Sequence, residues 1–333
     1  MGLGIVFAGG GGKGSYEIGI WKYLEEIGLS RYVEAVSGTS VGALNAALFS
    51  GSSYEIAEDI WLNISQDKIL TPKKYTKEEV CKVLLSAGLV GTASTIFLSS
   101  FVPLVLKKVL GDSFFSREGL EDIIEKARIF SRIQSGEIPC YVTCFNVSEK
   151  EPEYFKLSDY DNEDIVSLLL ATSAIPVVFE KVDFHGKKYW DGGIPIVGDN
   201  VPIKPLYDNG IEDIVVVHLD RETVIDKSKY PNAKIIEIVP SEDLGNLKNG
   251  TLDFSPEGSR ERIELGYADA KKALKPFVEM CQLSAYNAYI LSEAKKDMAI
   301  FNEKKQELNE KSKQIKEELK SIDLSQIMKG KRR

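Results

Sequence analysis

The chain places a serine between two glycines, in the segment Gly38-Thr39-Ser40-Val41-Gly42, after a strand-like stretch and before a helix-prone run. A nucleophilic serine on such a strand-to-helix turn has a strained backbone, and glycines two positions away on both sides let the neighbouring backbone pass closely. We call this segment the elbow. The same residues also fit an ordinary helix start, with Thr39 or Ser40 as the N-cap.

Short apolar runs alternate with helix-like stretches through most of the chain, which predicts an α/β fold with a mostly parallel central sheet covered on both faces. Residues 182–190 are typical of a hairpin that turns at His185 and Gly186. The predicted strands are residues 3–8, 32–36, 138–147, 214–219 and 234–239, and the predicted helices are residues 13–28, 41–50, 53–65, 117–129 and 162–174.

A run of glycines, Gly9–Gly14 with Lys13 inside it, follows the first predicted strand; we call it the glycine loop. Unshielded N–H groups before a helix bind phosphate or a transient oxyanion equally well. The spacing of Gly9, Gly11 and Gly14 also fits a dinucleotide-binding loop, with Glu34 as the ribose ligand. An oxyanion hole is favoured, because a dinucleotide site gives no reason for an elbow at the end of the next strand.

The turn Asp191-Gly192-Gly193 ends the predicted hairpin and offers a carboxylate that another loop can approach closely. If Asp191 reaches Ser40 Oγ, it can take the proton directly and form a Ser-Asp dyad. The order Ser40, Asp191, His218 also matches a Ser-His-Asp triad, but Ser40 follows only the second strand, earlier than in α/β-hydrolases. We therefore expect His218 to be a strand-end residue with a satisfied ring.

Composition limits the other classes of function. The net charge of −8 and a pI near 5.2 argue against a nucleic-acid partner. Four cysteines without C-x-x-C spacing and only two histidines disfavour a zinc site, so we expect free thiols, buried at Cys140 and Cys144. The chain starts directly with a core-like strand and no secretion signal is apparent, which favours a cytoplasmic location.

Two segments suggest further contacts. Residues 83–106 carry no charge and have basic flanks, which suits a lid or a peripheral membrane element; a buried insertion and a transmembrane helix are the alternatives. After about residue 255 the pattern is almost wholly helical, and residues 303–328 combine Lys and Glu with sparse apolar side chains. Such a helix is either solvated or bound to a partner helix.

The glycine loop, the elbow and the Asp191 turn, taken in this order and spacing, resemble the patatin-like phospholipase family. Two further stretches, Ala171–Pro176 and Asn200–Pro202, are similar to that family as well. The resemblance covers most of residues 1–200, and it implies a three-layer α/β/α catalytic domain, which we place at residues 1–255, before a helical segment at 256–333.

The resemblance also implies the roles of the site residues. Ser40 is the nucleophile, Asp191 is the base, and the N–H groups of Gly10, Gly11 and Gly12 form the oxyanion hole. The supporting positions are Gly9, Lys13, Gly14, Gly38, Gly42, Gly192 and Gly193, with Lys13 helping to orient the glycine loop.

The implied activity is that of a serine lipid acyl hydrolase that cleaves phospholipid or lysophospholipid esters through an acyl-enzyme, without a metal or cofactor. Two alternatives remain open at this stage. One is a nucleotide-binding module that uses Gly9–Gly14, and the other is a non-enzymatic scaffold associated with a membrane.

Overall fold

The computed structural model describes residues 2–64, 71–72, 115–116, 118–176 and 179–321. The chain divides into two compact units, Met1–Ala273 and Leu274–Arg333. The uncharged segment 83–106, predicted to be a lid or lipid-facing insertion, lies outside the described residues. Within the described part, no helix is both long and apolar enough to cross a membrane.

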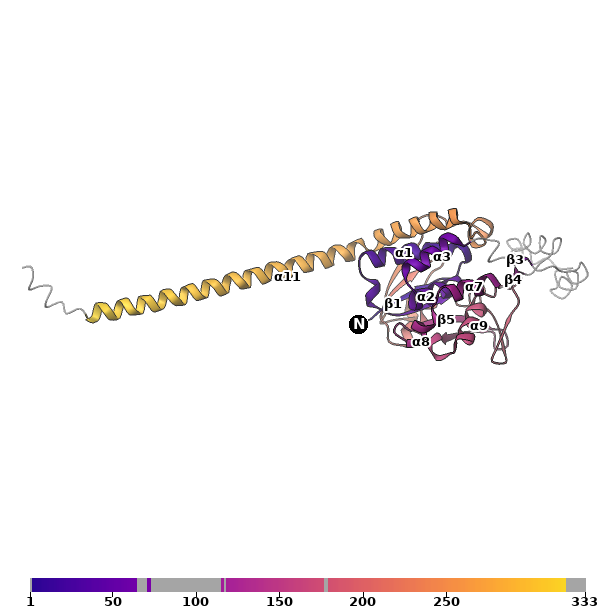
Figure 1. Cartoon of the computed structure of the whole chain (residues 1–333), viewed down its shortest axis with the longest axis horizontal. Helices are drawn as coiled ribbons and strands as arrows, with labels where there is room; N and C mark the ends of the chain where they lie inside the picture. The colour runs from indigo at the N-terminus through magenta and orange to yellow at the C-terminus, as the bar shows by residue number, and fades with distance from the viewer. Residues whose placement is uncertain (1, 65–70, 73–114, 117, 177–178, 322–333) are drawn as a thin grey trace, which may run out of the picture. The chain divides into compact units, whose positions relative to one another are not determined.

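Among the residues that the structure describes, the first unit contains every strand and every helix except the later part of α11 (Figure 1). Its strands are β1 (Leu3–Phe7), β2 (Val33–Thr39), β3 (Thr71–Pro72), β4 (Phe115–Ser116), β5 (Cys140–Asn146), β6 (Glu151–Lys156), β7 (Val182–Phe184), β8 (Lys187–Asp191), β9 (Asp213–Val217) and β10 (Lys234–Ile238). Its helices are α1 (Ser15–Glu26), α2 (Val41–Gly51), α3 (Tyr54–Asn63), α7 (Glu118–Lys126), α8 (Phe130–Ser135), α9 (Asn162–Thr172), α10 (Lys204–Asp208) and the start of α11 (Pro256–Ser321). Two single-turn helices matter below, η1 (Gly11–Gly14) and η5 (Leu247–Thr251).

Every helix and strand predicted from the sequence is present, with ends shifted by a few residues, and the hairpin of β7 and β8 is confirmed. The two-residue strands β3 and β4, strand β6 and the short helices α8 and α10 were not predicted. The β6 sequence contains Pro152 and acidic residues and is only partly buried, so it lacks the apolar run of a central strand. A five-residue helix such as α10 is too short for a helical period to be recognised.

The main sheet has the strand order β10-β9-β1-β2-β5-β8-β7, and β6 also pairs with β5. The pairs from β10 to β5 along this order are parallel, whereas β6, β7 and β8 join by antiparallel pairing. The carboxyl ends of β1 and β2 therefore meet at one edge of the sheet. The glycine loop follows β1 and the elbow follows β2, so the topology brings these two segments together.

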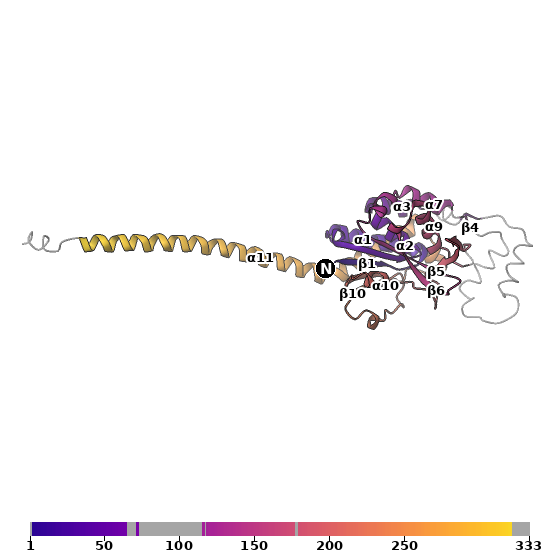
Figure 2. The same ribbon diagram turned by 90° about the horizontal axis from the view of Figure 1, so that it is seen from below.

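Helices cover both faces of this sheet (Figure 2). On one face, the ring of Phe7 in β1 lies 6.1 Å from the ring of Phe49 in α2. On the other, Val6 belongs to a buried cluster with Leu206 of α10 and Val216 of β9. The neighbouring residues Val6 and Phe7 of β1 thus pack against opposite helical layers, as expected for a strand buried on both faces. The predicted three-layer α/β/α arrangement is confirmed.

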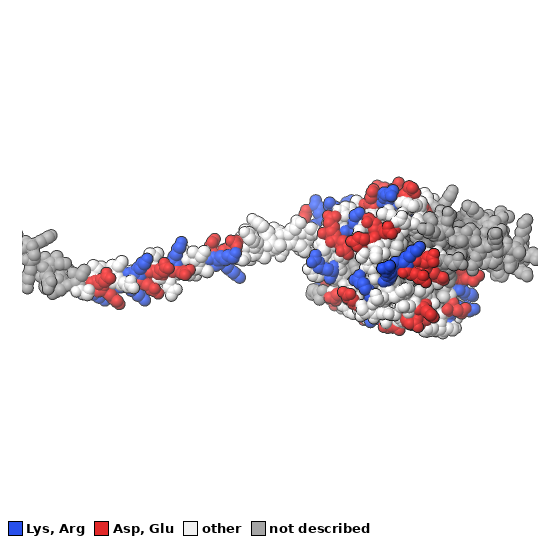
Figure 3. Space-filling model, in the orientation of Figure 1, with Lys and Arg blue, Asp and Glu red and all other residues white. Residues whose placement is uncertain are grey.

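The second unit, Leu274–Arg333, is described as far as Ser321 and consists of the C-terminal part of α11. The predicted change to an almost wholly helical pattern is confirmed. Most of its large apolar side chains are exposed, and acidic and basic side chains alternate along its later part (Figure 3).

Candidate active site

The elbow forms a strained turn between β2 and α2. Ser40 has φ 56° and ψ −128°, a backbone conformation that residues other than glycine rarely adopt. A Cβ atom on Gly38 would overlap the Gly42 carbonyl, and one on Gly42 would overlap the Phe7 carbonyl at the end of β1. The two glycines are therefore required by close backbone contact, and Ser40 is held at the tip of the turn.

The Ser40 hydroxyl group forms a hydrogen bond with the Asp191 carboxylate. Ser40 Oγ donates a hydrogen bond of 2.6 Å to Asp191 Oδ2, and the two residues are only 6% and 5% exposed. The other oxygen, Oδ1, accepts a 2.8 Å bond from the Gly193 N–H group. The Ser40 N–H group donates to Thr172 Oγ1 at 2.9 Å, which ties the tip of the elbow to α9. Each polar group of this pair therefore has a defined partner.

Burial changes the acidity of the carboxyl group. Removal from water raises the pKa of Asp191 to about 6, while the hydrogen bonds from Ser40 and Gly193 oppose that rise. At neutral pH most molecules still carry the carboxylate, which is a stronger base than an ordinary aspartate. The desolvation that a Ser-Asp dyad requires is thus present.

Two glycines of the Asp191 turn are also required by packing. A Cβ atom on Gly192 would overlap the Thr143 carbonyl of β5, and one on Gly193 would overlap the Asn200 side chain. Asp191 pairs with Cys144 of β5, so β8 carries the carboxylate to the edge of the sheet where the elbow lies.

The glycine loop lies beside Ser40. A Cβ atom on Gly9 would be 3.2 Å from the Ser40 Cβ atom, and Gly9 exchanges two bonds with Asn200, its N–H donating to the Asn200 carbonyl and its carbonyl accepting from Asn200 Nδ2. The N–H groups of the next three glycines donate to no acceptor among the described residues: these are Gly10, Gly11 and Gly12. Gly10 is the N-cap of η1 and the other two are its first residues, the positions where backbone N–H groups have no partner within a helix. Their predicted role as an oxyanion hole stays a prediction.

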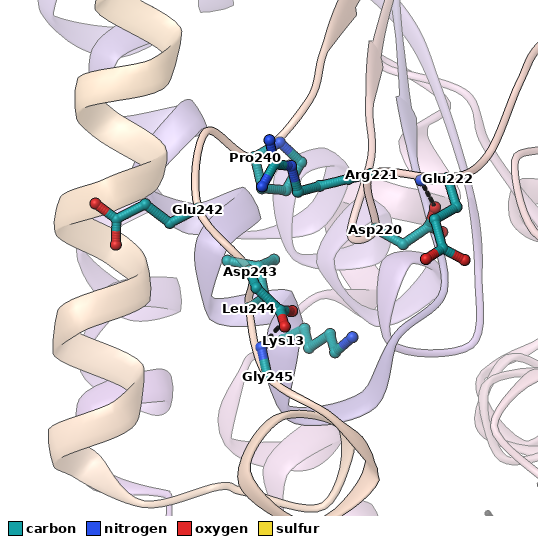
Figure 4. Close-up of a pocket in the computed structure, with 9 residues that line it drawn as sticks. All are labelled: Lys13, Asp220, Arg221, Glu222, Pro240, Glu242, Asp243, Leu244 and Gly245. Atoms are coloured by element: carbon teal, nitrogen blue, oxygen red, sulfur yellow. Dashed lines mark hydrogen bonds between the residues drawn. The ribbon is translucent and has the colours of Figure 1, made fainter.

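The other supporting positions have different surroundings. A Cβ atom on Gly14 would overlap the Val41 side chain, so this glycine allows η1 to pack against α2. Lys13 lines a cavity of about 620 Å³ with Asp220, Arg221, Glu222, Pro240, Glu242, Asp243, Leu244 and Gly245 (Figure 4). Within the described residues, no ion pair or hydrogen bond joins the Lys13 ammonium to the loop. Its predicted role in orienting the loop stays a prediction.

A clamp from the C-terminal part of the first unit holds the glycine loop, and the sequence did not reveal it. Cβ atoms on Gly11 and Gly12 would overlap the carbonyls of Thr251 and Asp253. Arg262, only 7% exposed, donates from Nη1 to the Gly12 carbonyl at 3.2 Å and to the Asp253 carbonyl at 3.1 Å. Its Nη2 atom forms a 2.6 Å ion pair with the Asp253 carboxylate. The loop is thus fixed on its outer side.

His218 does not join the pair. Its ring is 1% exposed, and Nε2 lies 3.1 Å from Glu237 Oε2 on β10, while Nδ1 is buried without a partner among the described residues. The prediction of a strand-end histidine is confirmed, but its ring is satisfied only on one nitrogen. His185 lies at the tip of the predicted hairpin, where its ring is exposed and Nε2 is 3.1 Å from Asp164 Oδ2. No hydrogen bond among the described residues joins His218 to Ser40 or to Asp191, as a Ser-His-Asp triad would need.

The dinucleotide hypothesis fails on the position of Glu34. This residue lies near the start of β2, where its carboxylate borders Gly2, whereas the glycine loop follows the opposite end of β1. A ligand at the loop would therefore not meet Glu34. The predicted buried thiols are confirmed at Cys140 and Cys144.

A three-layer α/β/α fold with a serine elbow, a buried aspartate and a glycine loop defines an esterase-like class of site. The family profile described as patatin-like phospholipase matches residues 5–207. The chain belongs to the patatin-like phospholipase family, whose members are lipid ester hydrolases. The matched region includes the elbow and Asp191 but ends before Arg262.

The curated relatives and the solved structures share only a low sequence identity with this chain. Lysophospholipase NTE1 of Cryptococcus neoformans var. neoformans serotype D, from two strains, is 26% identical over 215 residues, which are 65% of this chain and 11% of the relative. The chain therefore spans about a tenth of the length of these relatives.

Three solved structures illustrate the structural neighbours. VipD from Legionella pneumophila has a TM-score of 0.41 and 18% identity, covering 83% of this chain and 66% of that chain. A chain of the ExoU–SpcU complex from Pseudomonas aeruginosa has a TM-score of 0.38 and 18% identity, covering 84% and 52%. Human GIVD cytosolic phospholipase A2 has a TM-score of 0.36 and 12% identity, covering 84% and 58%.

Proposed function

We propose that this protein is a serine lipid acyl hydrolase that cleaves fatty-acyl esters of phospholipids or lysophospholipids. The observation that carries the proposal is the 2.6 Å hydrogen bond from Ser40 Oγ, on a strained elbow, to the buried Asp191 carboxylate. Membership of the patatin-like phospholipase family and the similarity to a protein named lysophospholipase support the lipid substrate.

In the first half of the reaction, Ser40 Oγ attacks the ester carbonyl carbon while its proton passes to Asp191 Oδ2. The carbonyl oxygen becomes an oxyanion, and the free N–H groups of Gly10–Gly12 stabilise it. When this intermediate collapses, Asp191 returns the proton to the departing alcohol. The fatty acyl group remains on Ser40 as an ester.

In the second half, a water molecule gives its proton to Asp191 and attacks the acyl carbonyl. The oxyanion forms again at the glycine loop, the bond to Ser40 breaks, and Asp191 returns the proton to Ser40 Oγ. The products are a free fatty acid and the starting enzyme. One carboxylate serves both halves, because each needs a base first and an acid afterwards.

The surroundings of Asp191 suit this exchange. A carboxylate whose pKa is raised to about 6 accepts a serine proton more readily than one at its ordinary value, and it is still ionised at neutral pH. Burial of both side chains also strengthens the electrostatic interaction between them. Lipid contact through 83–106 and a cytoplasmic location stay predictions.

The test measures fatty-acid release from mixed phospholipid and lysophospholipid vesicles by mass spectrometry. The parent protein is expected to release fatty acid, and Ser40→Ala is expected to release none above background while its thermal unfolding stays cooperative. A folded parent that hydrolyses neither lipid, or a Ser40→Ala variant as active as the parent, would contradict the proposal.

A further inference from the structure

The second unit presents an apolar seam along α11. Positions on this seam are separated alternately by three and four residues, the heptad spacing of a coiled coil. They are Leu291, Ala294, Met298, Phe301, Lys305, Leu308, Ser312, Ile315 and Leu319. Every large apolar member is more than half exposed, from 56% at Ile315 to 66% at Met298 and Leu308.

This seam is not covered by any residue that the structure describes. Ordinary surface helices bury their apolar stripe against a core, and an isolated helix without such packing is marginal in water. Toward the start of the unit the same spacing passes through the polar positions Asn287 and Ser284 before it reaches Met280 and Phe277, which are also exposed. An exposed apolar seam of this kind is typical of a helix that packs against a second helix.

Charge patterning is compatible with another copy of α11 as the second helix. From Glu293 to Lys320 acidic and basic side chains occur in nearly equal numbers, so two copies can approach without net repulsion (Figure 3). A strongly basic or strongly acidic partner would gain little from such a surface. The helix is electrostatically suited to itself.

The same pattern selects the orientation. In a parallel pair in register, Lys305 would face its own copy across the seam, and Lys311 would lie beside Lys316 of the other helix. Both contacts place like charges together. A parallel dimer is therefore disfavoured.

An antiparallel pair centred between Met298 and Phe301 removes these conflicts. Met298 then faces Phe301, and Leu291 faces Leu308, each twice by symmetry. On the flank of the seam, Asp297 lies opposite Lys304 at two symmetric places.

We propose that α11 mediates homodimerisation through an antiparallel coiled coil along this seam. The partner is a second copy of the chain, and the contact is independent of the proposed hydrolase activity. Lys305 fits the arrangement because it faces the small Ala294, over which its aliphatic stem can extend to bring the ammonium to water.

The full-length protein tests this by sedimentation velocity over a dilution series. The parent is expected to be a dimer, and Phe301→Asp is expected to raise the dimer dissociation constant by about 100-fold or more, since it places a charge in the seam twice. Ile300→Asp is the matched control, because Ile300 is 52% exposed on the same helix but lies off the seam. It is expected to leave the dimer intact.

Charge reversal tests the orientation. Asp297→Lys and Lys304→Asp are each expected to weaken the dimer, and the double variant is expected to restore it, because the reversed pairs attract again. A parent that stays monomeric throughout the dilution series, or a Phe301→Asp variant that dimerises as well as Ile300→Asp, would overturn the proposal. Single reversals without effect would overturn the antiparallel arrangement.

Discussion

The edge of the sheet that carries Ser40 differs from the helix beyond Ala273 in which groups are buried and which have partners. At the edge, polar groups are buried and are paired within the chain: Ser40 with Asp191, Asp191 with Gly193, and the Gly12 carbonyl with Arg262. Along the helix, apolar groups are exposed and have no partner among the described residues. The chemistry of the first region is determined by folding of one chain, whereas the second region is completed by association.

The two regions also differ in their free energy. The carboxylate of Asp191 is buried at a cost, because its pKa rises from 3.8 to about 6, which corresponds to about 3 kcal/mol for the ionised form at neutral pH. Ser40 adds backbone strain of about 1–3 kcal/mol. The buried carboxylate and the strained serine therefore lower the free energy of unfolding, and packing of the surrounding core offsets that loss.

The largest expected effect is on turnover. Asp191→Asn keeps the size of the side chain but removes the base, so we expect the rate of ester hydrolysis to fall by about 10²–10⁴-fold. The measurement is kcat on a soluble fatty-acyl ester, which avoids effects of vesicle binding. If Asp191→Asn kept parental turnover, the hydrogen bond between Ser40 and Asp191 would stabilise the fold without a role in catalysis.

The clamp on the glycine loop gives the next effect. Arg262→Met removes the hydrogen bonds that Nη1 donates to the Gly12 and Asp253 carbonyls. The N–H groups of the loop then lose their fixed position, so we expect kcat to fall by about 10-fold with a smaller change in KM. Arg260→Met is the control, because Arg260 is exposed on the same helix. Equal losses in the two variants would show that the clamp does not act through the loop.

The pH dependence sharpens the role of Asp191. The base must be ionised, and burial raises its pKa to about 6, so kcat/KM is expected to fall about tenfold per pH unit below that value. His218→Gln is expected to keep this acid limb, since His218 bonds Glu237 and not Ser40. An acid limb that disappeared in His218→Gln would assign it to the imidazole.

The smallest expected effect is on stability. A carboxyl group with a raised native pKa binds more protons in the folded state, so the free energy of unfolding falls as pH rises from about 4 to about 6. Asp191→Asn escapes this loss and is expected to have a higher Tm than the parent at pH 8, by several degrees, and a similar Tm at pH 4. Thermal unfolding of the two proteins at both pH values is the measurement. A lower Tm for Asp191→Asn at pH 8 would mean that the buried charge is not costly.

Much of the edge could be predicted because its requirements are local in sequence. Glycines on both sides of Ser40 reflect backbone contacts within the elbow and with β1, and apolar runs gave the central strands. Such features leave short-range patterns that a single sequence displays. The pairing of Asp191 with Ser40 spans 151 positions, so the residues alone left it conditional, and the resemblance to the patatin-like family implied it.

The rest could not be predicted because it depends on contacts between distant segments. Arg262 and Gly12 are separated by 250 positions, and nothing near either residue indicates the bond between them. Strand β6 contains a proline and acidic residues, so its pairing with β5 is recognisable only after folding. Glu34 had the spacing of a ribose ligand, but strand direction places it at the wrong end of the sheet.

In the proposed mechanism, Asp191 activates Ser40 directly. Labelling with a fluorophosphonate, followed by peptide mass spectrometry across a pH series, tests this activation in the parent, Asp191→Asn and His218→Gln. We predict a single adduct on Ser40 whose rate of formation falls below about pH 6, is retained in His218→Gln and is lost in Asp191→Asn. Labelling that survived in Asp191→Asn and vanished in His218→Gln would contradict direct activation of Ser40 by Asp191.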